Sequence, residues 1–162
     1  NADELESLVV GTRFVRAFAG ARLAAGAQAA LLKIEAVLPP DLRERSSRTP
    51  IFAPTWRDEK TLAFAARIDQ LHAAIGGNRV LELGYRDEAG NPSTREIEPL
   101  CLAFWGGKWT LGAWCRLRDS FRSFRPDRID DFRETGELFD EVAGRNLDAY
   151  LQAMRGHYTV ID

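Results

Sequence analysis

The sequence predicts an α+β fold in which N-terminal helices precede a sheet of five short strands, and a further helix follows the sheet. Three observations carry this prediction. Apolar residues recur every three or four positions in residues 3–19, 21–38 and 58–75, which is the period of a helix. Beyond Gly76-Gly77, apolar and polar residues alternate, as is typical of strands. Two of the alternating segments flank Gly106-Gly107, and a pair of glycines between strands favours a β-hairpin.

Three helices are expected before the sheet, at residues 3–19, 21–38 and 58–75. Asp3 is the expected cap of the first helix, and Gly20 ends it. The second helix is rich in alanine, and Pro39-Pro40 terminates it because proline cannot continue a helix. Residues 43–58 are rich in Arg, Ser, Thr and Pro and show no period, so we expect a loop there.

Strands are expected at residues 79–86, 94–105, 108–115, 120–125 and 128–134. Five short strands after one helix fit a small Sm/SH3-like β-barrel. A two-residue turn at Gly106-Gly107 pairs Trp105 with Lys108, and this register fixes which side chains share a face. The expected core face carries Leu100, Leu102 and Phe104 opposite Ala113, Leu111 and Trp109.

The other face of the predicted hairpin carries Trp105, Thr110 and Trp114. Either the N-terminal helices cover the two tryptophans, or the tryptophans form an exposed apolar patch of the kind that marks a partner site. The same register places Cys115 opposite Glu98 and directs the Cys101 and Cys115 side chains to opposite sides of the sheet. We therefore expect no disulfide between them.

The composition is that of an ordinary globular domain. The chain has 162 residues, 45% of them hydrophobic and 28% charged, with a net charge of −2. This mild acidity argues against binding duplex DNA by charge alone. With no secretory signal, no long apolar run and two unpaired cysteines, we expect a cytoplasmic protein that does not cross a membrane.

No catalytic residue, cofactor or metal site is expected. The sequence has no nucleophile elbow, no phosphate-binding glycine loop and no His-Glu-x-x-His motif. His72 and His157 are isolated on a predicted helix and in the C-terminal tail. Glu96 and Glu98 lie two apart on one strand face and could act as an acid/base couple, but a salt bridge to a nearby arginine is the alternative.

The most distinctive stretch is residues 116–129, which holds five arginines, two aspartates and two phenylalanines. Guanidinium groups beside aromatic rings suit phosphate, carboxylate or nucleobase ligands. Two alternatives to a binding role are open. The stretch could be a solvated charged face, or its arginines could all pair with carboxylates within the chain, chiefly in the acidic segment 130–148.

Four segments, residues 81–90, 95–100, 107–115 and 121–129, resemble successive strands of a WYL domain in order and spacing. Such domains occur in bacterial helix-turn-helix transcription regulators, and this chain is most similar to the YafY-like branch. The namesake Trp-Tyr-Leu is Trp109-Thr110-Leu111 here, so a threonine stands in place of the tyrosine.

The resemblance implies a ligand-binding groove lined by Arg122, Arg125, Arg128 and Thr110. It further implies a non-enzymatic module that senses an anionic or nucleotide-like effector, with single-stranded nucleic acid as another candidate ligand. Duplex DNA would be bound only by a winged helix-turn-helix domain expected ahead of residue 1. The alternative is a purely structural dimerisation domain that has lost ligand binding.

The expected organisation has four parts: a helical linker and dimerisation region at 1–45, a loop at 46–58, a WYL-type β-barrel domain at 59–135 and a C-terminal extension at 136–162. The alanine-rich stretch 21–30 favours close approach of another subunit, so a homodimer formed through the helices is expected. In the extension, Asn146 is the expected cap of a last helix that runs to Arg155.

Overall fold

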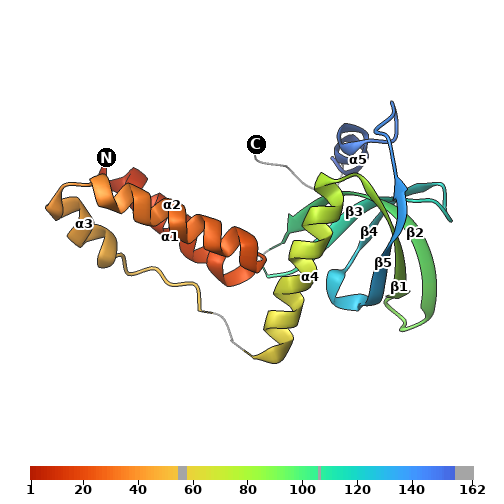
Figure 1. The fold of residues 1–162 in the computed structure, drawn as a ribbon, viewed down its shortest axis with the longest axis horizontal. Coiled ribbons are helices and arrows are strands. Elements are labelled where there is room, and N and C mark those ends of the chain that lie inside the picture. Colours follow the sequence, from red (N-terminus) through yellow and green to blue (C-terminus); the bar gives the residue numbers. More distant parts are fainter. Residues whose placement is uncertain (55–57, 106, 156–162) are drawn as a thin grey trace. The chain divides into compact units, whose positions relative to one another are not determined.

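The computed structural model describes residues 1–54, 58–105 and 107–155 and confirms the α+β class (Figure 1). N-terminal helices are followed by a five-stranded antiparallel sheet and a C-terminal helix. The chain forms two compact units, which comprise residues 1–69 and 70–162. Each unit is described by itself below. Within the described residues, no helix is both long enough and apolar enough to cross a membrane.

The first unit contains α1 (Ala2–Phe18), α2 (Ala21–Val37), α3 (Pro40–Ser47) and the beginning of α4 (Glu59–Gly76). Leu5 and Val9 of α1 pack with Leu31 of α2 in a small apolar cluster. The cap of α1 is Asn1 rather than the predicted Asp3: the Asn1 side chain accepts hydrogen bonds from the backbone N–H groups of residues 3 and 4. Glu4 completes a capping box with Asn1, so the helix begins at Ala2, earlier than predicted.

The predicted loop at 43–58 is partly wrong, because residues 43–47 belong to α3. Pro39-Pro40 ends α2 as expected, but Pro40 also opens the next helix. Proline suits the first turn of a helix, where its missing N–H is not needed. Ser46 fastens α3 to α2 by donating a hydrogen bond of 2.7 Å to the Glu35 carboxylate.

The second unit holds the rest of α4, β1 (Arg79–Arg86), β2 (Pro92–Phe104), β3 (Trp109–Cys115), β4 (Ser120–Phe124), the 3₁₀ turn η1 (Pro126–Arg128), β5 (Ile129–Leu138) and α5 (Leu147–Met154). The strand order is β4-β3-β2-β1-β5. Within the described residues, β4 and β5 are the edge strands and are not paired with each other. The structure therefore shows a five-stranded sheet without closing it into the predicted barrel.

The hairpin of β2 and β3 is confirmed. Trp105 donates its backbone N–H to the carbonyl of Lys108 at 2.8 Å. Four residue pairs from Cys101↔Gly112 to Phe104↔Trp109 have the predicted register. Gly106 lies outside the described residues, while Gly107 has a φ of 114°, which glycine adopts readily.

A β-bulge in β2 changes the register beyond the hairpin. Leu100 is an extra residue between the Pro99 and Cys101 pairings, so Cys115 pairs with Ile97 instead of the predicted Glu98. The bulge also turns Leu100 away from its predicted face. Leu100 packs in a cluster with Cys101 on the second face of the sheet.

Two apolar clusters lie on the two faces of the sheet. The first is covered by Leu71 and Ala74 of α4 and includes Leu81, Leu83, Ile97, Leu111, Ala113, Cys115, Phe124 and Ile129. The second contains Val80, Leu100, Phe139 and Tyr150, with Leu147, Leu151 and Met154 of α5 packed against it. The two free cysteines therefore lie in different clusters, as predicted. Burial raises the pKa of the Cys101 thiol.

Residues on the C-terminal side of the second unit contact Trp114. Its ring meets the Phe121 ring edge-on, with centroids 5.1 Å apart, and the Arg145 guanidinium lies 5.5 Å from its centroid. Coverage by the N-terminal helices is therefore not needed to explain its position. Trp105 is 44% exposed and donates its indole N–H to the Thr110 hydroxyl.

Two leucines on neighbouring strands test which side chains belong to the core. Leu83→Ala removes a side chain that is 0% exposed and should lower the free energy of unfolding by about 2–5 kcal/mol. Leu138→Ala, at a position that is 71% exposed, should change it by about 0.5 kcal/mol or less. Urea denaturation of both variants measures the difference, and equal losses would contradict this assignment of the core.

Candidate functional site

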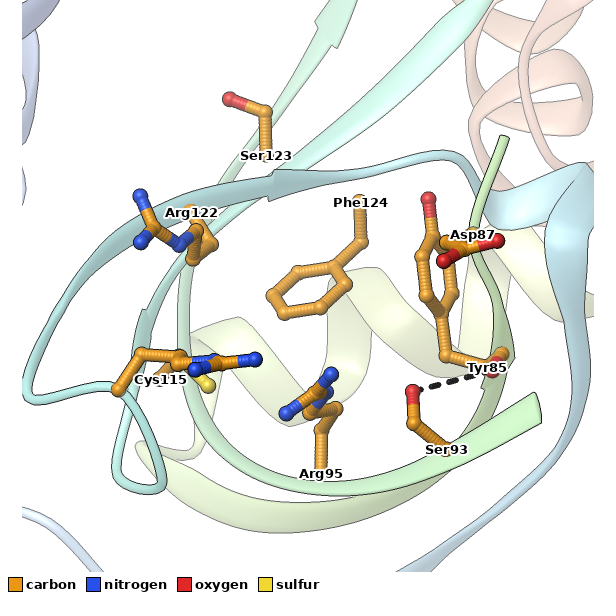
Figure 2. Close-up of a pocket in the computed structure, with 9 residues that line it drawn as sticks. Tyr85, Asp87, Ser93, Arg95, Cys115, Arg122, Ser123 and Phe124 are labelled. Atoms are coloured by element: carbon orange, nitrogen blue, oxygen red, sulfur yellow. Dashed lines mark hydrogen bonds between the residues drawn. The ribbon is translucent and has the colours of Figure 1, made fainter. Parts of the chain in front are cut away.

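A concave site opens beside the first apolar cluster, between β1, β2, the β3–β4 turn and β4 (Figure 2). Its cavity volume is about 300 Å³. The lining residues are Tyr85, Asp87, Ser93, Arg95, Cys115, Arg118, Arg122, Ser123 and Phe124. We call this site the arginine pocket.

Two aromatic residues form the apolar wall of the arginine pocket. Phe124 belongs to the first cluster, and the Tyr85 ring meets it edge-on with centroids 5.1 Å apart. The Tyr85 hydroxyl accepts the backbone N–H of Arg125 at 3.2 Å, and Ser93 donates to the Tyr85 carbonyl at 3.2 Å. These bonds fix Tyr85 against both neighbouring segments of the chain.

Three arginines enter the pocket from different segments: Arg95 from β2, Arg118 from the β3–β4 turn and Arg122 from β4. Among the described residues, none of the three has a carboxylate within ion-pair distance. Figure 2 shows Arg95 pointing toward the Phe124 ring, with Arg122 at the side of the pocket opposite Tyr85. The arrangement concentrates positive charge in one concavity.

Asp87 is the carboxylate among the lining residues, and its hydrogen bonds are made within the β1–β2 turn. It accepts hydrogen bonds from the Asn91 side chain at 3.1 Å and the Asn91 backbone at 2.8 Å. These bonds, the side-chain bond first, lower the pKa of Asp87. Asp87 is therefore ionised at neutral pH and serves the turn, while the three arginines of the pocket outnumber it.

The structure brings only one of the four predicted ligand residues into the arginine pocket, namely Arg122. Arg125 does not line the pocket and makes a bidentate pair with Asp127 at 2.8 and 2.7 Å. Arg128 lies 3.6 Å from the Glu88 carboxylate.

Thr110 lies on the opposite face of the sheet from Arg122. Ala113 pairs with Arg122, so these two side chains lie on one face of the sheet. Thr110 is three residues before Ala113 in β3, and because side chains alternate along a strand it lies on the other face. The Thr110 hydroxyl accepts the Trp105 indole N–H instead. A groove that contains both Thr110 and Arg122 is therefore not formed by the described residues.

Sequence reasoning missed Arg95 and Arg118 as pocket residues. Arg118 is part of the arginine-rich stretch, but only the turn geometry directs it toward Arg122. Arg95 pairs with Leu83 across β1 and β2, a register that the hairpin at Gly107 does not determine. Alternation along the strand could have placed Arg95 beside the pocket. Arg95 and Ile97 share a strand face, and Ile97 belongs to the first cluster.

A second charged cluster lies on the other face and is built around Glu98, which is 1% exposed. Arg116 donates from Nε to the Glu98 carboxylate at 2.9 Å, and Arg145 donates to both of its oxygens. Arg116 also contacts Glu137 at 2.7 Å and Glu96 at 3.6 Å. The hydrogen bond to Glu137, followed by that to Glu98, raises the pKa of Arg116. We call these five residues the Glu98 cluster.

The Glu98 cluster resolves the alternatives raised by the sequence. Glu96 and Glu98 form salt bridges to Arg116, which directly follows the neighbouring strand β3, as one alternative had it. The prediction that every arginine of the stretch pairs within the chain is wrong for Arg118 and Arg122 among the described residues. No group of His, Cys, Asp and Glu within that part of the chain could hold a metal ion. His157 lies outside it.

Comparison with known proteins identifies the sheet-containing part of the chain. Residues 66–134 match the family described as the WYL domain. The chain contains a WYL domain. The matched residues include the end of α4, strands β1 to β4 and most of β5. They also include all three arginines of the pocket.

Two known proteins are similar to parts of this chain. The chain is 34% identical over 82 residues to the uncharacterized HTH-type transcriptional regulator YobV of Bacillus subtilis (strain 168). The match covers 51% of this chain and 25% of YobV, so the chain spans about a quarter of the length of that relative. A solved structure, the proteasome accessory factor B/C (PafBC) of Arthrobacter aurescens, is similar with a TM-score of 0.45 and 20% identity, covering 90% of this chain and 21% of PafBC.

Two arginines of the WYL domain should differ in their effect on stability. Arg116→Gln removes a charged hydrogen bond from buried Glu98 and should lower the free energy of unfolding by about 1.5–3 kcal/mol. Arg122→Gln breaks no ion pair of the described residues and should change it by about 0.5 kcal/mol or less. Chemical denaturation compares the two variants. A larger loss for Arg122→Gln would mean that Arg122 is structural.

Proposed function

We propose that this chain is the effector-sensing part of a bacterial transcription regulator, and that its arginine pocket binds an anionic or nucleotide-like ligand. The observation that carries the proposal is the convergence of Arg95, Arg118 and Arg122 without carboxylate partners among the described residues. The similarity to YobV, named as an HTH-type transcriptional regulator, supports the regulatory role. DNA contact would belong to a separate helix-turn-helix domain.

The chemistry of the pocket favours an anion of modest size. Guanidinium groups bind phosphate and carboxylate oxygens through paired hydrogen bonds, which strengthen when both partners are charged. Three guanidiniums repel one another until an anion enters, so binding relieves the repulsion. Tyr85 and Phe124 add an apolar wall against which a ring or sugar could lie. A volume of about 300 Å³ suits one phosphorylated unit rather than a duplex.

A second role, dimerisation through the helices, is favoured by apolar residues left exposed in the first unit. Leu8 is 51% exposed on α1, and Leu32 is 55% exposed on α2. Exposed apolar side chains on helices suit burial against an equivalent helix of another copy. We propose a homodimer joined in this way. A chain that dimerises and binds no ligand is the competing function, with Thr110 in place of the family tyrosine as its support.

Finer features belong to the same proposal. The turn η1 leads directly from β4 into β5, which supports closure of the two edge strands into an Sm/SH3-like barrel. A regulator of this kind would act in the cytoplasm and without catalysis. The single-stranded form of a nucleic acid is the other ligand that fits the charge and the aromatic wall.

Binding of cyclic nucleotides and short single-stranded oligonucleotides tests the proposal. Wild type should bind at least one of them saturably, and Arg118→Gln or Arg122→Gln should weaken binding about tenfold or more, since each removes charge-assisted contacts of about 1.5–3 kcal/mol. Raising the salt concentration should weaken binding to phosphate further.

Arg133→Gln is the matched control. It removes the same charge from a side chain that pairs with Glu82 outside the pocket, so affinity should change less than about twofold. Isothermal titration at two salt concentrations measures all four proteins. The absence of saturable binding to every such ligand would favour the dimerisation domain instead.

A further inference from the structure

Two contacts between the C-terminal segment, residues 139–154, and the sheet lie close in the chain to arginines of the pocket. Phe139 and Tyr150 of this segment are buried in the second cluster, on the face opposite the arginine pocket. The segment contributes no residue to the lining of the pocket. Any influence on the pocket must therefore pass through the sheet.

The first contact is made by Arg145, which forms a salt bridge with the Glu98 carboxylate and lies over the Trp114 ring. Glu98 is shared with Arg116, the first residue of the turn that carries Arg118 into the pocket. The turn is held at its start by the Arg116 N–H, which donates to the carbonyl of Glu96 at 3.0 Å. Arg145 and Arg118 are thus connected through a short chain of bonded groups.

The second contact is made by Tyr150. Its hydroxyl forms a hydrogen bond of 3.0 Å with Ser123, and its ring meets Phe121 edge-on at 5.7 Å. The ring lies so close to Gly112 that a β-carbon there would come within 2.4 Å of it. Arg122 stands between Phe121 and Ser123 in β4 and points to the opposite face. Tyr150 therefore holds both neighbours of a pocket arginine.

We propose that the docked C-terminal segment holds Arg118 and Arg122 in the positions that anion binding needs, and that release of the segment weakens the pocket. The identity of the ligand rests on the proposed function, but the coupling between the segment and the two arginines does not. Glu98 and Arg116 then act as positioning residues. Coupling of this kind is reciprocal, so a bound anion stabilises the docked segment by the same factor.

The burial of Glu98 supplies the physical reason. A carboxylate that is 1% exposed needs its cationic partners, because removing one leaves a buried charge poorly compensated. Without Arg145, Glu98 depends on Arg116 alone, which also serves Glu96 and Glu137. Arg116, already bonded to Glu98 at 2.9 Å, is then its remaining cationic partner, and a rearrangement of Arg116 shifts the turn that carries Arg118.

Hydrogen exchange in the absence of any ligand tests the coupling. In Arg145→Gln, amides of residues 118–122 should exchange at least about fivefold faster than in wild type, while amides of Leu81 and Leu83 in β1 keep their rates. The control Arg133→Gln should leave residues 118–122 unchanged. Faster exchange at 147–154 with no change at 118–122 would overturn the proposal, since the segment would then release without affecting the pocket.

A milder variant serves if Arg145→Gln speeds exchange throughout the domain. Tyr150→Phe keeps the ring but removes the hydroxyl that bonds Ser123, and it should still speed exchange at 121–123 relative to β1. Unchanged exchange at 121–123 in this variant would equally overturn the coupling.

Titration with inorganic pyrophosphate tests the ligand arm. Arg145→Gln should weaken pyrophosphate binding about fivefold or more, although residue 145 does not line the pocket, and Arg133→Gln should change it less than about twofold. Equal affinities of Arg145→Gln and wild type would refute the coupling and leave the proposed function standing. If wild type binds neither pyrophosphate nor any nucleotide, the proposed function fails, and the exchange result alone decides the coupling.

Discussion

The burial of Glu98 between two arginines is the interaction on which the WYL domain of this chain most depends. The carboxylate is almost completely withdrawn from water, and desolvation of an ion costs several kcal/mol unless partners replace the water. Arg116 and Arg145 supply those partners from the β3–β4 turn and from the C-terminal segment. One side chain of β2 therefore joins segments that lie far apart in the sequence, and Glu137 at the end of β5 extends the cluster.

The two faces of the sheet differ in how their arginines are paired. On the face with the Glu98 cluster, arginines are matched by carboxylates, and α5 completes the apolar packing. On the other face, Arg95, Arg118 and Arg122 gather without such partners among the described residues. The bulge at Leu100 sets which side chains of β2 enter each cluster: Ile97 and Leu102 pack in the first cluster, and Leu100 and Cys101 in the second.

Local signals in the sequence predicted much of the fold. The bounds of β1, the hairpin at Gly107 and the cap of α5 at Asn146, which accepts the Ala149 N–H, follow from alternation, turn chemistry and capping. The bulge at Leu100 and the pocket position of Arg95 could not be predicted, because both depend on how non-neighbouring strands align. The arginine-rich stretch contributes Arg118 and Arg122 to the pocket, whereas Arg116, Arg125 and Arg128 lie close to carboxylates within the chain. Only the tertiary partners distinguish Arg116, which is structural, from Arg122, which faces the pocket.

The side-chain NMR signals of the arginine Nε–H groups test this division most directly. Arg116 and Arg145 donate from Nε to Glu98, so their signals should be protected from exchange with water and should not move when pyrophosphate is added. Signals of Arg95, Arg118 and Arg122 should exchange rapidly in the free protein and become protected and shifted on titration. Protected signals from the three pocket arginines before any anion is added, or no response to it, would contradict the account.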